Sequence, residues 1–100
     1  VSLILSFDRC ILISGDMMDL NDTLKSAVSH ALAGEWDASH KIAQEYNDAM
    51  ACWIHAVLHK IEGDASNSRY WYARTQGRNY EDFSDTQQEL REIARLLDSA

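Results

Sequence analysis

Three histidines with helical spacing are the residues of this sequence best suited to chemistry. His55 and His59 lie four positions apart within the segment WIHAVLHKIEGDASNSRYWYAR, residues 53–74, and His40 precedes them. Residues four positions apart share one face of a helix, and imidazole nitrogens are ligands of zinc and iron. If a helical hairpin brings His40 against this face, His40, His55 and His59 can together bind Zn or Fe. The sequence points to no other cofactor.

Two acidic residues lie one helical turn from these histidines. Asp37 precedes His40 by three positions and Glu62 follows His59 by three, so either carboxylate can serve a metal site as ligand or base. Position 56 is alanine, which excludes the H-E-x-x-H metalloprotease motif. Only Asp37 and His40 have the acid-first order that di-iron bundles need on two helices. A metal-dependent, hydrolase-like enzyme is therefore one alternative, with no catalytic residue assigned, and the sequence does not decide whether the chain is an enzyme.

Two further interpretations of the same residues need no metal. In the first, the imidazoles are partly buried, hydrogen-bonded, and fill the seam between two helices. In the second, they line a pocket for a small polar ligand between the second, third and fourth helices. We favour this pocket, and with it a non-enzymatic binding or interaction module. The residues expected in the pocket are Trp36, Asp37, His40, His55, His59, Glu62, Asp64, Asn67, Tyr70 and Trp71.

Hydrophobic periodicity predicts an all-α domain over residues 18–100. Apolar residues recur at the i, i+4, i+7 and i+8 positions of buried helix faces, and there is no proline to interrupt them. The links are short, so about five helices must lie mostly antiparallel to their neighbours, as stacked helical hairpins. They are expected at residues 20–33, 36–46, 49–62, from a cap near 64–67 to about 77, and from 84 onward.

Individual residues set the expected ends and inner faces of these helices. Gly34 and Gly63 are placed to end the first and third helices, and Ser84 with Gln87 forms a predicted capping box for the last. The third helix has the clearest apolar stripe, which runs to Ile61. In the fourth helix three aromatic residues are consecutive, so at least one of them must be exposed. The residues of these two faces are Met50, Ile54, Val57, Leu58 and Ile61, then Tyr70, Trp71 and Tyr72.

Composition limits the partners and the compartment. The formal net charge of -7 would repel a phosphate backbone, so nucleic acid is not expected as a partner. The apolar runs are too short to span a membrane. Two cysteines, one of them Cys52 within an apolar helical pattern, are typical of reduced thiols and favour a cytoplasmic location.

The first seventeen residues form a separate apolar segment. VSLILSFDRCILISG alternates like one or two strands but lacks the basic start and cleavage site of a signal peptide. An isolated hairpin is barely stable, so the segment would pack on the helices or pair with a second copy of the chain, and we expect a homodimer. Alternatively, translation begins at Met17 or Met18 and residues 1–17 are an upstream addition.

Two resemblances emerge from the middle of the chain. GEWDASHKIA from Gly34 and GDASNSRYWYA from Gly63 repeat a glycine, an acid and an aromatic-bearing helix, which resembles the helical hairpins of tetratricopeptide repeats. In addition, EWDASH followed by IHAVLHKIEGDASNSRYWYAR resembles a family of small uncharacterised bacterial and fungal proteins with W-D-x-x-H, L-H-x-x-E-G-D-x-x-N and Y-W-Y elements. That resemblance covers residues 34–75, implies no activity, and points to largely the same side chains as the predicted pocket.

Overall fold

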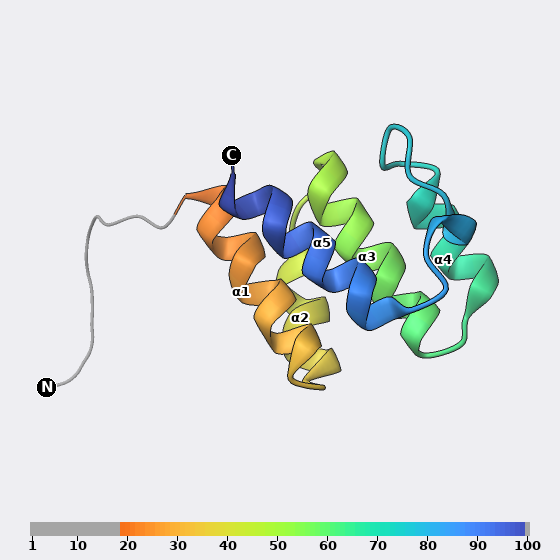
Figure 1. The fold of residues 1–100 in the computed structure, drawn as a ribbon, viewed down its shortest axis with the longest axis horizontal. Coiled ribbons are helices and arrows are strands. Elements are labelled where there is room, and N and C mark those ends of the chain that lie inside the picture. Colours follow the sequence, from red (N-terminus) through yellow and green to blue (C-terminus); the bar gives the residue numbers. More distant parts are fainter. Residues whose placement is uncertain (1–18, 100) are drawn as a thin grey trace, which may run out of the picture.

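The fold is all-α, as the hydrophobic periodicity predicts. The computed structural model describes residues 19–99, and this part of the chain forms five α-helices and one short 3-10 helix, with no strand (Figure 1). The predictions for residues 1–17 fall outside the described residues. None of the described helices is long and apolar enough to cross a membrane. In chain order the elements are α1 (Leu20–Leu32), α2 (Trp36–Ala43), α3 (Ala49–Ile61), α4 (Ala65–Tyr72), η1 (Tyr80–Asp82) and α5 (Thr86–Asp98).

Aspartate side chains begin four of the five α-helices. Each accepts a hydrogen bond from a backbone N–H of the first turn, where a carboxylate also interacts favourably with the helix dipole. At α1, for example, Asp19 Oδ1 lies 2.9 Å from the amide of Asp22. The four capping residues are Asp19, Asp48, Asp64 and Asp85.

Several predicted helix ends were wrong. The cap of α5 is Asp85 and not Ser84, because the Asp85 carboxylate accepts from both the Gln87 and the Gln88 amides. A capping box does occur, but in η1, between Asn79 and Asp82. The helices α2 and α4 also end earlier than predicted, at Ala43 and Tyr72, because the chain must turn before the next cap.

Two glycines end helices as predicted. Gly34 follows α1 with φ +82° and Gly63 follows α3 with φ +86°. This left-handed conformation is strained for residues with a Cβ atom, and it reverses the chain direction directly after a helix. The two turns therefore place α2 beside α1 and α4 beside α3.

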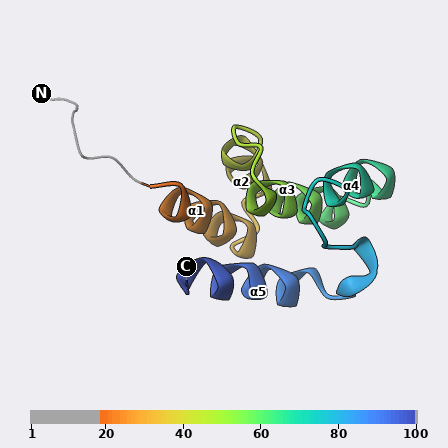
Figure 2. The same ribbon diagram turned by 90° about the horizontal axis from the view of Figure 1, so that it is seen from above.

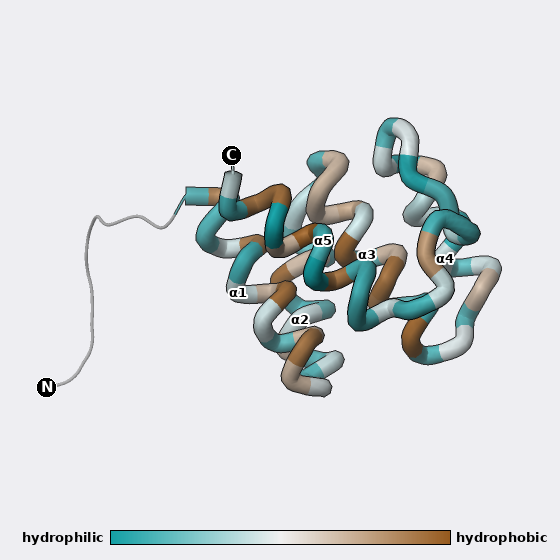
Figure 3. Tube along the Cα trace, in the orientation of Figure 1, coloured by the Kyte–Doolittle hydropathy of each residue, from teal (hydrophilic) through white to brown (hydrophobic). Residues whose placement is uncertain are grey.

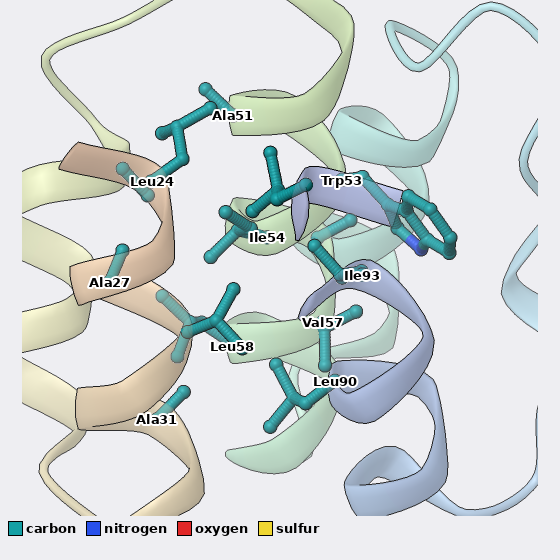
Figure 4. Packing of buried hydrophobic residues seen from close by; sticks show 14 of the residues in the cluster. Leu24, Ala27, Ala31, Ala51, Trp53, Ile54, Val57, Leu58, Leu90 and Ile93 are labelled. Carbon is teal, nitrogen blue, oxygen red and sulfur yellow. The ribbon is translucent and has the colours of Figure 1, made fainter. Parts of the chain in front are cut away.

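Helix α3 lies at the centre of the fold. It contacts α1, α2, α4 and α5, and Figure 2 shows α2 and α5 on opposite sides of the α1 and α3 pair. Residues 51–59 are buried without interruption, and Ile54, Val57 and Leu58 meet Leu24 of α1 and Leu90 of α5 in the core (Figure 4).

Helices α1, α2 and α5 show more amphipathic patterns than α3. Along α5, hydrophobic and hydrophilic residues alternate turn by turn (Figure 3), which is typical of a helix with one face on the core. In α4 the three consecutive aromatic residues separate as expected, because Tyr72 is buried, Trp71 is half-buried and Tyr70 is 50% exposed. Ile61 does not join the buried stripe of α3. It is 42% exposed, in the last turn of the helix, beyond the buried run.

A buried carboxylate that the sequence analysis missed joins α3, α4 and α5. The Glu89 side chain is completely buried and accepts hydrogen bonds from Trp53 Nε1 at 2.8 Å, from the Tyr72 hydroxyl at 2.6 Å and from Lys60 Nζ at 2.9 Å. Burial, and next the hydrogen bond to Glu89, raise the pKa of Tyr72 above its usual range. The carboxylate is thus fully partnered in the interior, as a buried charge must be.

Lys60 extends this network to the segment before α5. Its ammonium group donates to the backbone oxygens of Tyr80 at 2.8 Å and Phe83 at 2.6 Å. These carbonyls flank or belong to η1, so a single ammonium group fixes the link between α4 and α5 onto α3. The network therefore holds together three elements that are far apart in sequence.

Replacing Glu89 should lower the free energy of unfolding more than replacing an exposed acidic residue does. Glu89→Ala leaves the Lys60 charge, the Trp53 N–H and the Tyr72 hydroxyl without their acceptor, so we expect a loss of about 3–5 kcal/mol in the free energy of unfolding. Glu89→Gln keeps an acceptor and should lose less. Urea denaturation followed by circular dichroism measures both.

The control is Glu92→Gln, one turn further along α5, where the pair with Arg95 is exposed and about 1 kcal/mol or less is expected. Equal losses at positions 89 and 92 would contradict the role given to the network.

Candidate metal centre

The three predicted histidines meet between α2 and α3. The ring centroids of His40 and His55 lie 4.7 Å apart, those of His40 and His59 lie 5.3 Å apart, and those of His55 and His59 lie 4.9 Å apart. One ring nitrogen from each histidine lies within 4.8 Å of the corresponding nitrogens of the others. The expected packing of the His40 face against the His59 face thus takes place, and we call these three residues the histidine trio.

The spacing within the trio is close to what a metal ion requires. The Nε2 atoms of His40 and His55 are 3.1 Å apart, a hydrogen-bond distance when one nitrogen is protonated and the other is not. Around tetrahedral zinc, with Zn–N bonds of about 2.0–2.1 Å, ligand nitrogens are separated by roughly 3.3 Å. Small side-chain rotations would therefore bring three nitrogens to one ion.

Two tryptophans hold the trio in place. Trp36 stacks on His40 with ring centroids 4.6 Å apart, and its own Nε1 donates to the Leu58 carbonyl at 2.7 Å. Trp71 of α4 stacks on His55 at 4.0 Å. His55 and His59 are only 5% and 7% exposed. The indoles fix the ring orientations and keep most water away from the imidazoles.

Glu62 determines which nitrogen of His59 remains available. The Glu62 carboxylate lies 2.5 Å from His59 Nδ1, where it can accept a hydrogen bond from Nδ1–H; a neutral ring in this tautomer has its lone pair on Nε2. A carboxylate hydrogen-bonded to the remote nitrogen of a ligating histidine is the usual outer partner in metal sites, where it fixes the tautomer and raises the basicity of the ligand. Glu62 is therefore better suited to orient His59 than to bind the same ion.

Burial favours the neutral forms of His55 and His40. The pKa of His55 is lowered to about 4 from 6.5, by burial first and then by the nearby His40 and His59 imidazoles. Burial and His59 also lower the pKa of His40, against smaller opposing effects of Glu62 and Asp37. A metal ion binds the unprotonated nitrogen, so protons do not compete strongly for these ligands near neutral pH.

Other predicted pocket residues lie further from the histidine trio. Asp64 caps α4 by accepting from the Asn67 amide at 3.3 Å, and its carboxylate also forms a second ligand group with His59 and Glu62, within 4.8 Å. Asp37 is exposed on α2. Tyr70 packs edge-on against Trp71 at 5.0 Å and does not reach the trio.

The hollows on the surface do not coincide with the predicted pocket. Two hollows, of about 190 and 480 Å³, lie around Arg69, Tyr80 and Glu81, and none of the ten predicted pocket residues lines them. A pocket for a small polar ligand beside the trio stays a prediction. Sequence patterns did not predict these hollows, because many of their lining residues come from the link between α4 and α5.

Comparison with known proteins identifies no relative of this chain. No protein-family model, no curated protein and no solved structure matches it. The resemblances to the small bacterial and fungal family and to tetratricopeptide hairpins stay predictions. The site must therefore be interpreted from its own geometry.

The lowered pKa values of His55 and His40 make stability dependent on pH. Because the folded-state pKa of His55 is about 4 and the unfolded value is 6.5, the unfolded chain binds more protons between these values. Stability should therefore fall as the pH drops from about 6.5 to about 4, by about 3 kcal/mol from His55, with His40 acting in the same direction. Urea denaturation at a series of pH values, with a chelator present, measures this slope.

Two variants test whether the dependence of stability on pH arises from His55. His55→Gln should flatten it, since the substituted side chain does not titrate. His30→Gln should keep it, because His30 lies far along the chain on α1, where it pairs with Glu35 at the surface. A slope that is unchanged in His55→Gln would contradict the assignment.

Proposed function

We propose that this chain is a helical binding module whose ligand is a divalent transition-metal ion, held by His40, His55 and His59. The observation that carries the proposal is the convergence of three ring nitrogens within 4.8 Å of one another. Structural packing alone would be satisfied by one hydrogen bond for each imidazole. It does not require three imidazoles to converge at one point.

The donor set favours zinc. Three neutral imidazoles without thiolate or thioether ligands suit borderline ions such as Zn²⁺ and Fe²⁺, and disfavour Mg²⁺ and Ca²⁺, which prefer oxygen ligands. The only cysteine in the described residues, Cys52, is buried and donates towards the Asn47 carbonyl. It therefore does not compete with the trio for the ion.

The metal would also act on the fold. His40 comes from α2, whereas His55 and His59 come from α3. An ion bound to all three would link the α1 and α2 hairpin to the α3 and α4 hairpin, and its binding energy would be added to the stability of the domain.

A hydrolase-like enzyme is the second candidate. Three protein ligands leave the fourth position of a tetrahedral ion for water, as in catalytic zinc sites. Against catalysis, the Glu62 carboxylate is already bound to His59, and Asp37 is exposed, so neither is placed as a free base. Binding without chemistry is therefore the better supported function.

The remaining parts of the proposal concern setting and assembly. A free, buried Cys52 fits a reducing compartment such as the cytoplasm. Leu20, Ile61 and Tyr70 are large apolar side chains that the described residues leave exposed, and they give two copies of the chain a means to associate. Sedimentation velocity with and without zinc would separate monomer from dimer.

Zinc titration tests the metal site directly. For protein purified without an affinity tag and stripped with a chelator, we expect one zinc ion per chain by calorimetry. The His55→Ala, His59→Ala double variant should lose this binding, whereas His30→Ala should keep it, because His30 lies outside the trio. Substituting Co²⁺ should give the intense visible absorption of tetrahedral coordination.

Two milder variants keep the test valid if the double variant does not fold. His40→Ala removes a partly exposed ligand from the short helix α2, and Glu62→Gln removes only the partner of His59, for which an affinity loss of about 10–100-fold is expected. Circular dichroism confirms that each variant is folded. If folded His40→Ala binds zinc as tightly as the parent chain, the trio is not the site.

Catalysis by the loaded site is tested separately. Zinc-loaded and metal-free protein are compared for hydrolysis of an activated carboxylic ester and an activated phosphate ester. We expect equal rates in the two forms. Zinc-dependent turnover that is lost in His40→Ala and kept in His30→Ala would instead establish the hydrolase.

A further inference from the structure

A basic segment of the chain lies outside the histidine trio. Residues 65–80 contain three arginines and no acidic residue, although the whole chain has a net charge of -7. Each guanidinium lies over an aromatic ring: Arg69 over Tyr80 at 4.3 Å, Arg74 over Tyr70 at 3.9 Å, and Arg78 over Trp53 at 4.1 Å. These contacts hold long cationic side chains in defined positions.

Arg78 is the most firmly held of the three. Its amide donates to Thr75 Oγ1 at 2.9 Å, and the same hydroxyl contacts the Arg78 carbonyl at 3.3 Å. Thr75 is itself 5% exposed, and the turn between them includes Gln76 and Gly77 with positive φ. Backbone and side chain are thus both fixed before any ligand arrives.

The guanidinium of Arg78 has no acidic partner. Within residues 19–99 it forms no ion pair within 4.0 Å, whereas Arg69 and Arg95 both do. The carboxylate of Glu92 is near enough for Arg78 to lower its pKa slightly, but Arg95 is the main cause and binds it with two hydrogen bonds. Asp82 accepts from the Asn79 amide, and Glu81 pairs with Arg69. The N–H donors of Arg78 are therefore available.

A hollow of about 190 Å³ has Arg78 among its lining residues. Its walls include Arg78, Arg69, Glu81 and the rings of Tyr72 and Tyr80. The larger hollow of about 480 Å³ shares Arg69, Tyr80 and Glu81 with it, so the two form a continuous depression. Arg69 is engaged by Glu81 at 2.5 Å, which leaves one unpaired positive charge beside two aromatic walls.

We propose that this depression binds a small aromatic carboxylate, with the carboxylate held by the Arg78 guanidinium and the ring beside Tyr80. One unpaired guanidinium matches one carboxylate in charge, and its planar fork matches the two oxygens. A dianion such as phosphate would be left with excess negative charge next to Glu81. The proposal is independent of metal binding at the trio, which shares no residue with these walls.

Nuclear magnetic resonance of the full chain tests the proposal. The protein, labelled with ¹⁵N, is titrated with benzoate, acetate and inorganic phosphate at constant ionic strength and neutral pH. Benzoate should give saturable shifts confined to residues 69–81 and the Arg78 side chain. Acetate, which lacks the ring, should bind more weakly at the same residues, and phosphate should not saturate.

Variants of the arginines decide the outcome. Arg78→Gln should weaken benzoate binding by about tenfold or more, and Arg78→Lys, which keeps the charge but loses the fork, should weaken it by a similar factor. Arg91→Gln, at an exposed position of α5 outside the hollows, should leave it unchanged. Linear shifts with benzoate, saturation by phosphate at lower concentration, or equal effects of the 78 and 91 substitutions would each overturn the proposal.

Discussion

The burial of α3 on every side is the constraint on which the rest of this structure depends. Residues 51–59 have no exposed position, yet the helix carries His55, His59 and, directly after them, Lys60. A polar group taken out of water costs several kcal/mol unless it finds a partner inside. The neighbouring helices supply these partners. The packing of α2, α4 and α5 around α3 therefore also offsets the cost of burying the three polar side chains.

The histidines and Lys60 solve this problem in opposite ways. His40 and His55 favour the neutral form, because burial and nearby imidazoles lower their pKa values, and neutral imidazoles can hydrogen-bond to one another. Lys60 instead keeps its charge and takes the Glu89 carboxylate into the interior. The side of α3 that carries the histidine trio is therefore suited to binding a metal ion. On the other side, the charges of Lys60 and Glu89 neutralise each other.

Helical spacing predicted the helix faces well, and with them the meeting of His40 with His59. It failed to predict a helix end where two neighbouring residues are equally suitable as the cap. Ser84 and Asp85 are both good caps, and only the path of the chain selects the carboxylate. For α2, the pattern continues to Tyr46, but the helix ends at Ala43 because the chain turns towards the Asp48 cap of α3.

Glu89 was missed although the sequence contains its signal. It precedes Ile93 and Leu97 by four and eight positions, so it lies on the inner face of α5. Charge made it look like a solvent-exposed residue. The hollows around Tyr80 had no such signal, since their walls belong to a link without periodicity, whose path depends on hydrogen bonds from Lys60 to backbone oxygens.

The stacking of Trp36 and Trp71 on the histidine trio gives the molecule a built-in optical probe. Excited indoles are quenched by an adjacent imidazolium and by many transition metals, so fluorescence emission from these two side chains would report the state of the imidazoles beneath them. The chain has three tryptophans, and the third, Trp53, bonds to Glu89 instead. Its emission would add a background that does not depend on the trio.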